Sequence, residues 1–144
     1  MSYLTANDRI RAVEAIINYG FHNPQFIANA LKAAGSSGAA QGNKRLALIG
    51  DAVLRLVLYE LGYEEDRSIG DMTSAQNTRA TNENLARIGF SLGLSAFIQL
   101  SPSAQGVVPE RLMATTIEAI IGAVYLDSGR DIMVVRALIR FMRI

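Results

Sequence analysis

The chain has 144 residues, half of them hydrophobic, with a formal net charge of +1, no cysteine and one histidine, His22. This length can bury a core without a disulfide or a structural metal, and the missing cysteines exclude thiolate catalysis and zinc–thiolate sites. A charge near zero indicates neither a nucleic-acid nor a membrane partner. Without cysteine and with a single histidine, carboxylates are the available metal ligands. We expect a single domain over residues 1–144.

The first predicted elements are two helices. Thr5 or Asn7 can cap a helix that runs to about Ile17, because its apolar residues recur every three to four positions. Asn23 can cap a second helix that starts with Pro24 and runs to about Ala33. Residues 35–43 are rich in glycine and serine, so we expect a flexible connection there.

Residues 43–63 form the longest apolar run of the chain. Apolar side chains fall on nearly every face and the run is too long for a buried strand, which predicts a central helix. Asp51 stands in its middle. A buried ionised carboxylate is costly, so either Asp51 faces a cleft, a cation or a capping donor, or the segment is not a helix.

The second half predicts four more helices. Ser68 opens a polar helix to about Thr81, and Asn82 starts another that stops at Gly93. Residues 101–110 predict a loop. A second long apolar helix follows from Pro109 to Gly129, and a last helix covers residues 131–144. No segment alternates like a strand, so the fold class is all-α with about seven or eight helices.

Charge is unevenly placed along the chain. The last segment holds four arginines and the region after the central helix holds one acidic run, and we interpret both as solvated surface: Arg130, Arg136, Arg140 and Arg143, and Glu64, Glu65 and Asp66. The apolar run at 46–58 is too short for a bilayer and is interrupted by charge, and the start of the chain lacks a signal-peptide core. We therefore expect a soluble, intracellular protein of the cytoplasm, nucleus or mitochondrion.

Each long apolar helix carries one central acid, Asp51 in the first and Glu118 in the second. This pattern predicts two carboxylates that meet across a helix crossing, where Gly122 and Ala123 would allow close approach. Such a pair suits Mg²⁺ or Mn²⁺, which can activate water for phosphodiester hydrolysis. In the alternative interpretation, each acid caps a backbone group or pairs with an arginine such as Arg45 or Arg55.

Two motifs carry a family resemblance. NKRLALIGDAVL resembles the ribonuclease III signature, and ATTIEAIIGAVYLDSG resembles the second motif of that family. YGFHNPQFIANAL, GDMT and NENLARIGFSLGL agree further, so the resemblance covers about Tyr19 to Gly129. It implies an all-helical endonuclease that cleaves double-stranded RNA as a homodimer, with divalent metal held by four carboxylates per site.

The resemblance also implies a degenerate site. Asp51 and Glu118 match metal-binding acids, whereas the other two metal-binding positions fall on Ala47 and Thr115, and the first Glu of the signature falls on Lys44. Mg²⁺ or Mn²⁺ should then bind weakly, and cleavage should be impaired or lost, as in a pseudo-enzyme. If activity is retained, Asp51 and Glu118 hold the metal whose water attacks the phosphodiester. Lys44 either replaces part of the metal's charge or faces solvent.

Further expectations concern partners. The family commonly adds a double-stranded-RNA-binding domain, which these 144 residues do not contain, so affinity for double-stranded or structured RNA would come from the nuclease-domain surface and depend on salt. One alternative function is a non-catalytic assembly module in a ribonucleoprotein, as in some relatives in mitochondrial ribosomes. Another is one half of a heterodimer whose partner supplies an intact site.

Overall fold

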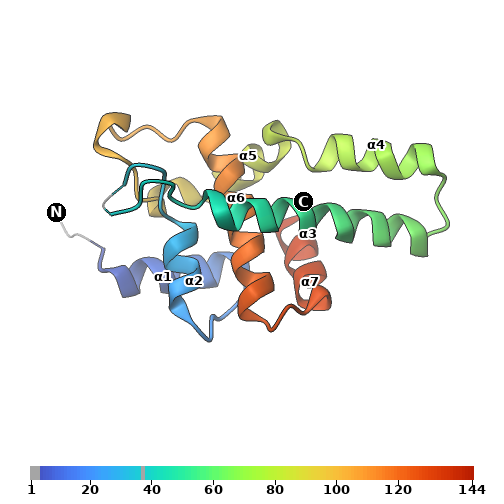
Figure 1. Cartoon of the computed structure of the whole chain (residues 1–144), viewed down its shortest axis with the longest axis horizontal. Coiled ribbons are helices and arrows are strands. Elements are labelled where there is room, and N and C mark those ends of the chain that lie inside the picture. Colours follow the sequence, from blue (N-terminus) through green and yellow to red (C-terminus); the bar gives the residue numbers. More distant parts are fainter. Residues whose placement is uncertain (1–3, 37) are drawn as a thin grey trace.

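The computed structural model describes residues 4–36 and 38–144, and these residues form an all-α fold with two isolated β-bridges and no sheet. The helices in chain order are α1 (Ala6–Ile17), α2 (Pro24–Ala30), α3 (Lys44–Glu64), α4 (Ile69–Arg79), α5 (Asn82–Ser91), the 3₁₀ helices η1 (Leu94–Phe97) and η2 (Pro102–Ala104), α6 (Glu110–Asp127) and α7 (Ile132–Met142). Seven α-helices confirm the predicted fold class and number (Figure 1).

Local capping explains where most helices begin. Five of them follow a side chain that accepts a hydrogen bond from the main chain of the first turn: Thr5, Asn23, Ser68, Thr81 and Asp131. At α1 the arrangement is reciprocal, because the carboxylate of Asp8 also accepts from the main-chain nitrogen of Thr5 at 3.3 Å. These starts agree with the sequence predictions.

Four helices end two or three residues before their predicted ends, α2, α4, α6 and α7, and the first and last of them show the cause. The second helix ends at Ala30 instead of about Ala33, because the chain beyond it pairs with residue Gln99. The main chain of Gln99 donates to Leu31 at 2.8 Å and accepts from Ala33 at 2.9 Å. The last helix ends at Met142, and the following residue is left-handed with φ 62°. Long-range pairing and a C-cap therefore shortened α2 and α7.

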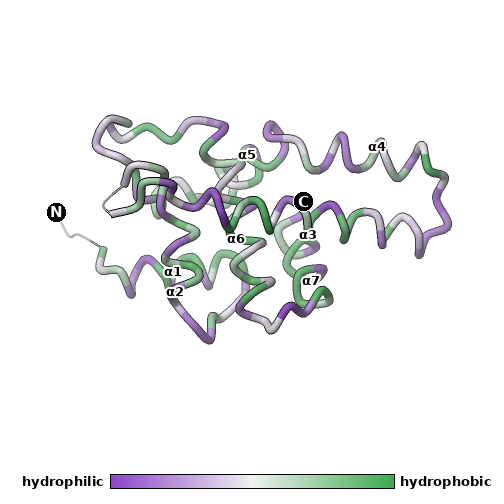
Figure 2. The backbone as a smooth tube through the Cα atoms, viewed as in Figure 1, coloured by the Kyte–Doolittle hydropathy of each residue, from purple (hydrophilic) through white to green (hydrophobic). Residues whose placement is uncertain are grey.

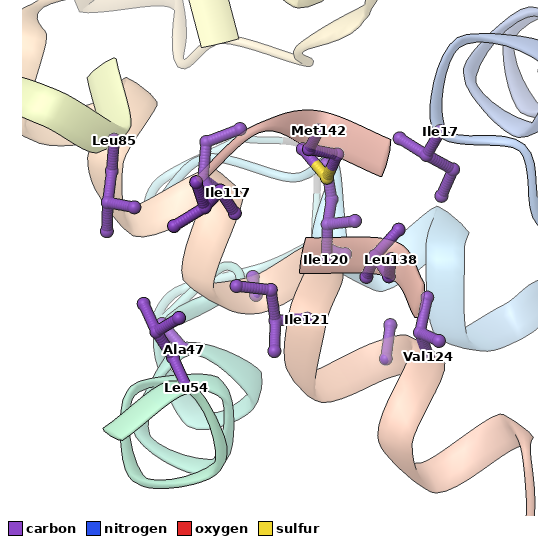
Figure 3. Close-up of a cluster of buried hydrophobic side chains, with 14 of the residues drawn as sticks. Ile17, Ala47, Leu54, Leu85, Ile117, Ile120, Ile121, Val124, Leu138 and Met142 are labelled. Carbon is purple, nitrogen blue, oxygen red and sulfur yellow. The ribbon is translucent and has the colours of Figure 1, made fainter. Parts of the chain in front are cut away.

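The core surrounds α6. Ten of its residues are buried, and it contacts α2, α3, α5 and α7. Figure 3 shows Ile117, Ile120, Ile121 and Val124 of this helix among side chains from several other helices. The predicted central helix, α3, is less enclosed, since Leu48 is 75% exposed and Leu56 is 49% exposed. The second apolar run, rather than the first, lies at the centre of the molecule.

Glycines set the crossing of α3 and α6. A Cβ atom built at Gly50 would overlap the main-chain oxygen of Glu118, and one built at Gly122 would overlap the main-chain oxygen of Leu46. The two backbones therefore touch directly, as the small residues after Glu118 predicted. This contact brings the middle of each apolar helix to the same point.

The helices α3 and α4 form a hairpin that extends to one side of the molecule (Figure 1). No residue of α4 is buried, and its colouring is mostly hydrophilic or neutral in Figure 2. The hairpin closes tightly where Met72 packs on Gly62. Among the described residues, no helix is long and apolar enough to cross a bilayer.

Candidate functional site

A groove of about 860 Å³ lies between the first half of α3 and the first half of α6. Its lining residues are Ala34, Asn43, Lys44, Ala47, Leu48, Asp51, Pro109, Arg111, Leu112, Thr115 and Glu118. The structure thus gathers in one groove all five positions that the sequence singled out, from two helices that are far apart in the chain. The glycine crossing explains this, because Gly50 precedes Asp51 and rests on the backbone of Glu118.

The two acids of the groove have different surroundings. Asp51 is 39% exposed and accepts a hydrogen bond from Nη2 of Arg55 at 3.2 Å, one turn along α3. Of the two arginines proposed as partners, Arg55 makes this ion pair. Burial raises the pKa of Glu118 to about 8, together with a hydrogen bond and charge repulsion from Asp51, which Arg55 offsets in part. Glu118 therefore keeps its proton over most of the neutral range.

The positions one turn from these acids carry no carboxylate. Ala47 is 7% exposed and has no ligand atom, and Thr115 has only a neutral hydroxyl. Both line the groove beside Asp51 and Glu118. Within residues 4–36 and 38–144, no three Asp, Glu, His or Cys side chains come together as a metal-binding group.

Two cations line the same groove. Lys44 is the first residue of α3, and Arg111 lies in the first turn of α6; both are exposed. No carboxylate in the described part of the chain pairs with either one. Lys44 was predicted from the sequence as a position of the site, whereas Arg111 was not. Its signal was spacing, because Arg111 precedes Glu118 by seven residues, about two helical turns, as Lys44 precedes Asp51.

Asn43 holds the start of α3 in place at the groove. Its side chain is buried, and its amide nitrogen donates to the main-chain oxygen of Ala30 at 2.8 Å and to Oγ1 of Thr116 at 3.1 Å. The hydroxyl of Thr116 donates in turn to the main-chain oxygen of Leu112 at 2.8 Å. Although Asn43 precedes α3, it makes no side-chain cap and instead ties three helices together. Sequence reasoning did not assign it this role.

Asp127, an acid near the end of the second motif, has a structural role outside the groove. Its side chain is 1% exposed and accepts from the hydroxyl of Tyr19 at 2.6 Å and from the main-chain nitrogens of His22 and Asn23 at 2.9 and 2.7 Å. Burial alone would raise the pKa of Asp127, but these hydrogen bonds outweigh it and the pKa is lowered. Asp127 therefore anchors the segment before α2 to the end of α6.

Comparisons with known proteins agree with this architecture. The ribonuclease III domain model matches residues 44–129. Ribonuclease 3 of Idiomarina loihiensis is 32% identical over 124 residues, covering 83% of this chain and 53% of that protein. Ribonuclease 3 of Shewanella woodyi is 35% identical over 108 residues, covering 72% and 47%. The chain spans about half the length of the curated relatives it matches.

Solved structures extend the similarity to the fold. The nuclease domain of ribonuclease III from Campylobacter jejuni superposes with a TM-score of 0.83 at 27% identity, covering 93% of this chain and 96% of that one. The work on that domain concerns structural flexibility in a region involved in dimer formation. A second structure of the same domain, at 2.2 Å resolution, gives a TM-score of 0.81. With its matched family model, its relatives and its fold, the chain belongs to the ribonuclease III domain family.

Proposed function

We propose that this chain is a ribonuclease III domain that binds double-stranded or structured RNA, with metal-dependent cleavage impaired or lost. The observation that carries the proposal is the groove, where two acids, Asp51 and Glu118, stand beside Ala47 and Thr115. Each of these two neighbours lies one helical turn from an acid, at a position where the family places another carboxylate. The groove offers two carboxylates where the family uses four.

The residues present fit a divalent metal poorly. The family generally uses Mg²⁺, which when bound activates water and stabilises the leaving oxygen. Here Asp51 is paired with Arg55, and Glu118 holds its proton up to a pKa of about 8. A metal would have to displace both that cation and that proton. Weak binding of Mg²⁺ or Mn²⁺ follows from this donor set.

The cations of the groove support binding of phosphate instead. Lys44 and Arg111 line it without a carboxylate partner among the described residues, and the carboxyl group of Glu118, which lines the same groove, is largely protonated because its pKa is raised to about 8. This groove therefore does not repel a phosphodiester backbone, whereas a site with four acids and no metal would repel it. An A-form duplex presents its phosphates and 2′-hydroxyls rather than its base edges, so recognition by shape and charge suits double-stranded RNA.

An exposed apolar stripe on α3 supports a homodimer. Leu48, Ala52 and Leu56 recur every four residues and are all exposed, with Leu48 at 75% and Leu56 at 49%. Exposed leucines in register on one helix face are typical of a protein interface. The similar nuclease domain of Campylobacter jejuni has a region involved in dimer formation. A second copy of this chain is the proposed occupant.

A non-catalytic assembly module is the second candidate function. It is favoured by Tyr63 and Ile69, which are 80% and 85% exposed where α3 turns into α4. Large apolar side chains that project from the far end of a hairpin suit contact with another protein. In this function the fold would hold a partner protein or a ribonucleoprotein without cleaving RNA.

The test is binding and cleavage of a long RNA duplex with Mg²⁺ or Mn²⁺. We expect binding without metal, which Lys44→Glu weakens, and little or no cleavage. The double variant Ala47→Glu/Thr115→Asp should gain metal-dependent cleavage and tighter Mg²⁺ binding by calorimetry. The matched control Ala15→Glu/Thr73→Asp adds the same two acids at exposed positions outside the groove and should gain neither.

Three results would contradict the proposal. If the wild-type chain cleaved the RNA duplex and Glu118→Gln abolished this cleavage, the catalytic site would be intact. A folded Ala47→Glu/Thr115→Asp variant without cleavage would show that the two missing acids are not the whole reason for low activity. Absence of RNA binding, with recovery of a stable protein complex in its place, would favour the assembly module.

A further inference from the structure

A second groove, of about 770 Å³, lies between α7, the C-terminal end of α3, the end of α4 and the residue after α1. Four arginines line it, Arg79, Arg136, Arg140 and Arg143, together with a single acid, Glu65. Its charged residues sum to +3, whereas the whole chain carries +1. The sequence predicted solvated surface for Arg136, Arg140 and Arg143, and the structure gathers these three with Arg79 around one groove, which Arg130 does not line.

Internal partners occupy two of the four guanidinium groups. Arg136 donates to both carboxylate oxygens of Glu64, at 2.8 and 2.9 Å. Arg79 donates to the main-chain oxygen of Ile144 at 2.6 Å and 3.2 Å, through Nη2 and Nε. These two contacts hold α7 against α3 and α4, so Arg79 and Arg136 shape the wall of the groove.

The other two guanidinium groups are available to a ligand. Arg140 and Arg143 are exposed, and in the described part of the chain no carboxylate lies within ion-pair distance of them. The one acid of the groove, Glu65, is engaged by Nε of Arg67 at 2.6 Å. A planar guanidinium group without a partner matches a phosphate in geometry and charge.

The helix dipole does not account for this arrangement. Arg140 stands in the last turn of α7, where a partial charge of about −0.5 favours one cation. Arg143 adds a second cation just beyond that turn, so positive charge remains in excess. The dipole also gives no reason for the aromatic side chain placed between the two arginines in sequence.

That aromatic side chain is Phe141, which is 50% exposed and lines the groove with Met133, 59% exposed. In a duplex the base faces are stacked on each other, whereas an unpaired base can stack on an exposed ring. Free guanidinium groups beside an exposed ring are the combination that binds single-stranded nucleic acid. A duplex bound only through its phosphates would not require the exposed ring of Phe141.

We propose that this groove binds a single-stranded RNA segment, with Arg140 and Arg143 on its phosphates and a base stacked on Phe141. The proposal goes beyond duplex binding in the groove of Asp51, because the two grooves share no lining residue. A chain that failed to bind duplex could still bind a single strand here, and the reverse also holds. Together the two grooves would recognise a duplex with an unpaired flank.

The experiment measures fluorescence anisotropy of a labelled twelve-nucleotide oligouridine, and of a duplex of equal length, over a range of salt. Arg140→Gln/Arg143→Gln should weaken binding of the single strand and make the slope of log K against log salt shallower by about 1.4. Arg11→Gln/Arg87→Gln removes the same charge at exposed positions outside the groove and should change the slope little. Phe141→Ala should weaken binding roughly tenfold at unchanged slope, and Phe141→Tyr should restore it.

If Arg140→Gln/Arg143→Gln and Arg11→Gln/Arg87→Gln weakened single-strand binding equally, the proposal would be overturned, because binding would then depend on the overall charge of the chain. A Phe141→Ala variant with wild-type affinity would also overturn it, as would a duplex that competes for this groove as well as the single strand does. Photocrosslinking of 4-thiouridine RNA to the wild-type chain tests the same site without depending on the folding of a variant. Crosslinks should fall on the last two turns of α7, and crosslinks confined to other elements would refute the site.

Discussion

At the scale of single residues, the groove is defined by the pair Asp51 and Glu118. The crossing of α3 and α6 holds the two carboxyl groups together, and Arg55 forms an ion pair with Asp51 while it lowers the pKa of Glu118 only in part. In a site with four acids, a metal offsets such repulsion. In this chain the repulsion is relieved by a proton, because the pKa of Glu118 is raised to about 8.

This raised pKa predicts a pH-dependent stability. The folded-state pKa of Glu118 lies above its ordinary value of 4.5, so its contribution is fully present below about 4.5 and is lost as pH rises through about 8. Glu118→Gln should therefore raise the free energy of unfolding at pH 8 by about 1 kcal/mol, after allowance for the partial exposure of the site. The gain should shrink toward pH 4.5.

Thermal unfolding of both proteins between pH 4.5 and 8.5 measures this effect. Glu83→Gln is the control, because Glu83 is exposed on α5 away from the groove, and it should not stabilise the chain at pH 8. A Glu118→Gln variant less stable than wild type at pH 8 would show that Glu118 makes a stabilising ionic contact.

At the scale of elements, the contact between α3 and α6 positions the site. The backbones of α3 and α6 approach closely only because Gly50 and Gly122 lack side chains. The buried amide of Asn43 adds a second tie between the start of α3 and α6, through Thr116. The relative placement of the two acids is thus a property of the helix pair rather than of the acids.

Gly50→Ala should disrupt this placement. Its Cβ would overlap the main-chain oxygen of Glu118, and a backbone cannot give way as a flexible side chain can, so we expect a loss of about 3 kcal/mol in the free energy of unfolding. Gly70→Ala is the matched control, since the nearest atom to its Cβ is Oγ of Ser68 at 3.9 Å within an exposed helix. It should be neutral or stabilising by up to about 1 kcal/mol.

Chemical denaturation of the two variants provides the comparison. A Gly50→Ala variant as stable as Gly70→Ala would show that the two helices can separate at little cost. In that case the crossing would not hold the two carboxyl groups of the groove in place.

At the scale of the whole molecule, neighbouring faces of α3 have different surroundings. One face packs on α6 and lines the groove, and the next leaves the stripe Leu48, Ala52 and Leu56 exposed, with Leu48 at the edge of the groove. Burial of this stripe against a second copy would add apolar area to the α3 region without closing the arginine groove of α7. The proposed homodimer would then present two copies of each groove.

Leu56→Lys should shift the chain from dimer to monomer in sedimentation equilibrium, with at least a roughly tenfold loss of affinity, because an unpaired charge would be buried in the interface. Ile69→Lys makes the same kind of change at a residue that is 85% exposed at the far end of the hairpin, and it should leave the dimer intact. A wild-type chain that sediments as a monomer at micromolar concentration would contradict the homodimer and direct attention to a different partner chain.

The sequence by itself determined the helices and the two acids. Helix starts at Thr5, Asn23 and Ser68 depend on hydrogen bonds within one turn, and the buried faces depend on periodicity within a helix, so neighbouring residues suffice to predict them. The motifs identified the family for the same reason, because they are contiguous. The end of α2 was missed, because its partner, Gln99, is distant in the chain.

Only the tertiary structure decided which charges share a surface. Arg111 joins Lys44 in one groove, and Arg79 joins the arginines of α7 in the other, because helices from distant parts of the chain cross there. The structure also placed α6 rather than α3 at the centre of the core. Such contacts depend on how closely backbones approach, which glycines such as Gly50 permit but no local pattern specifies.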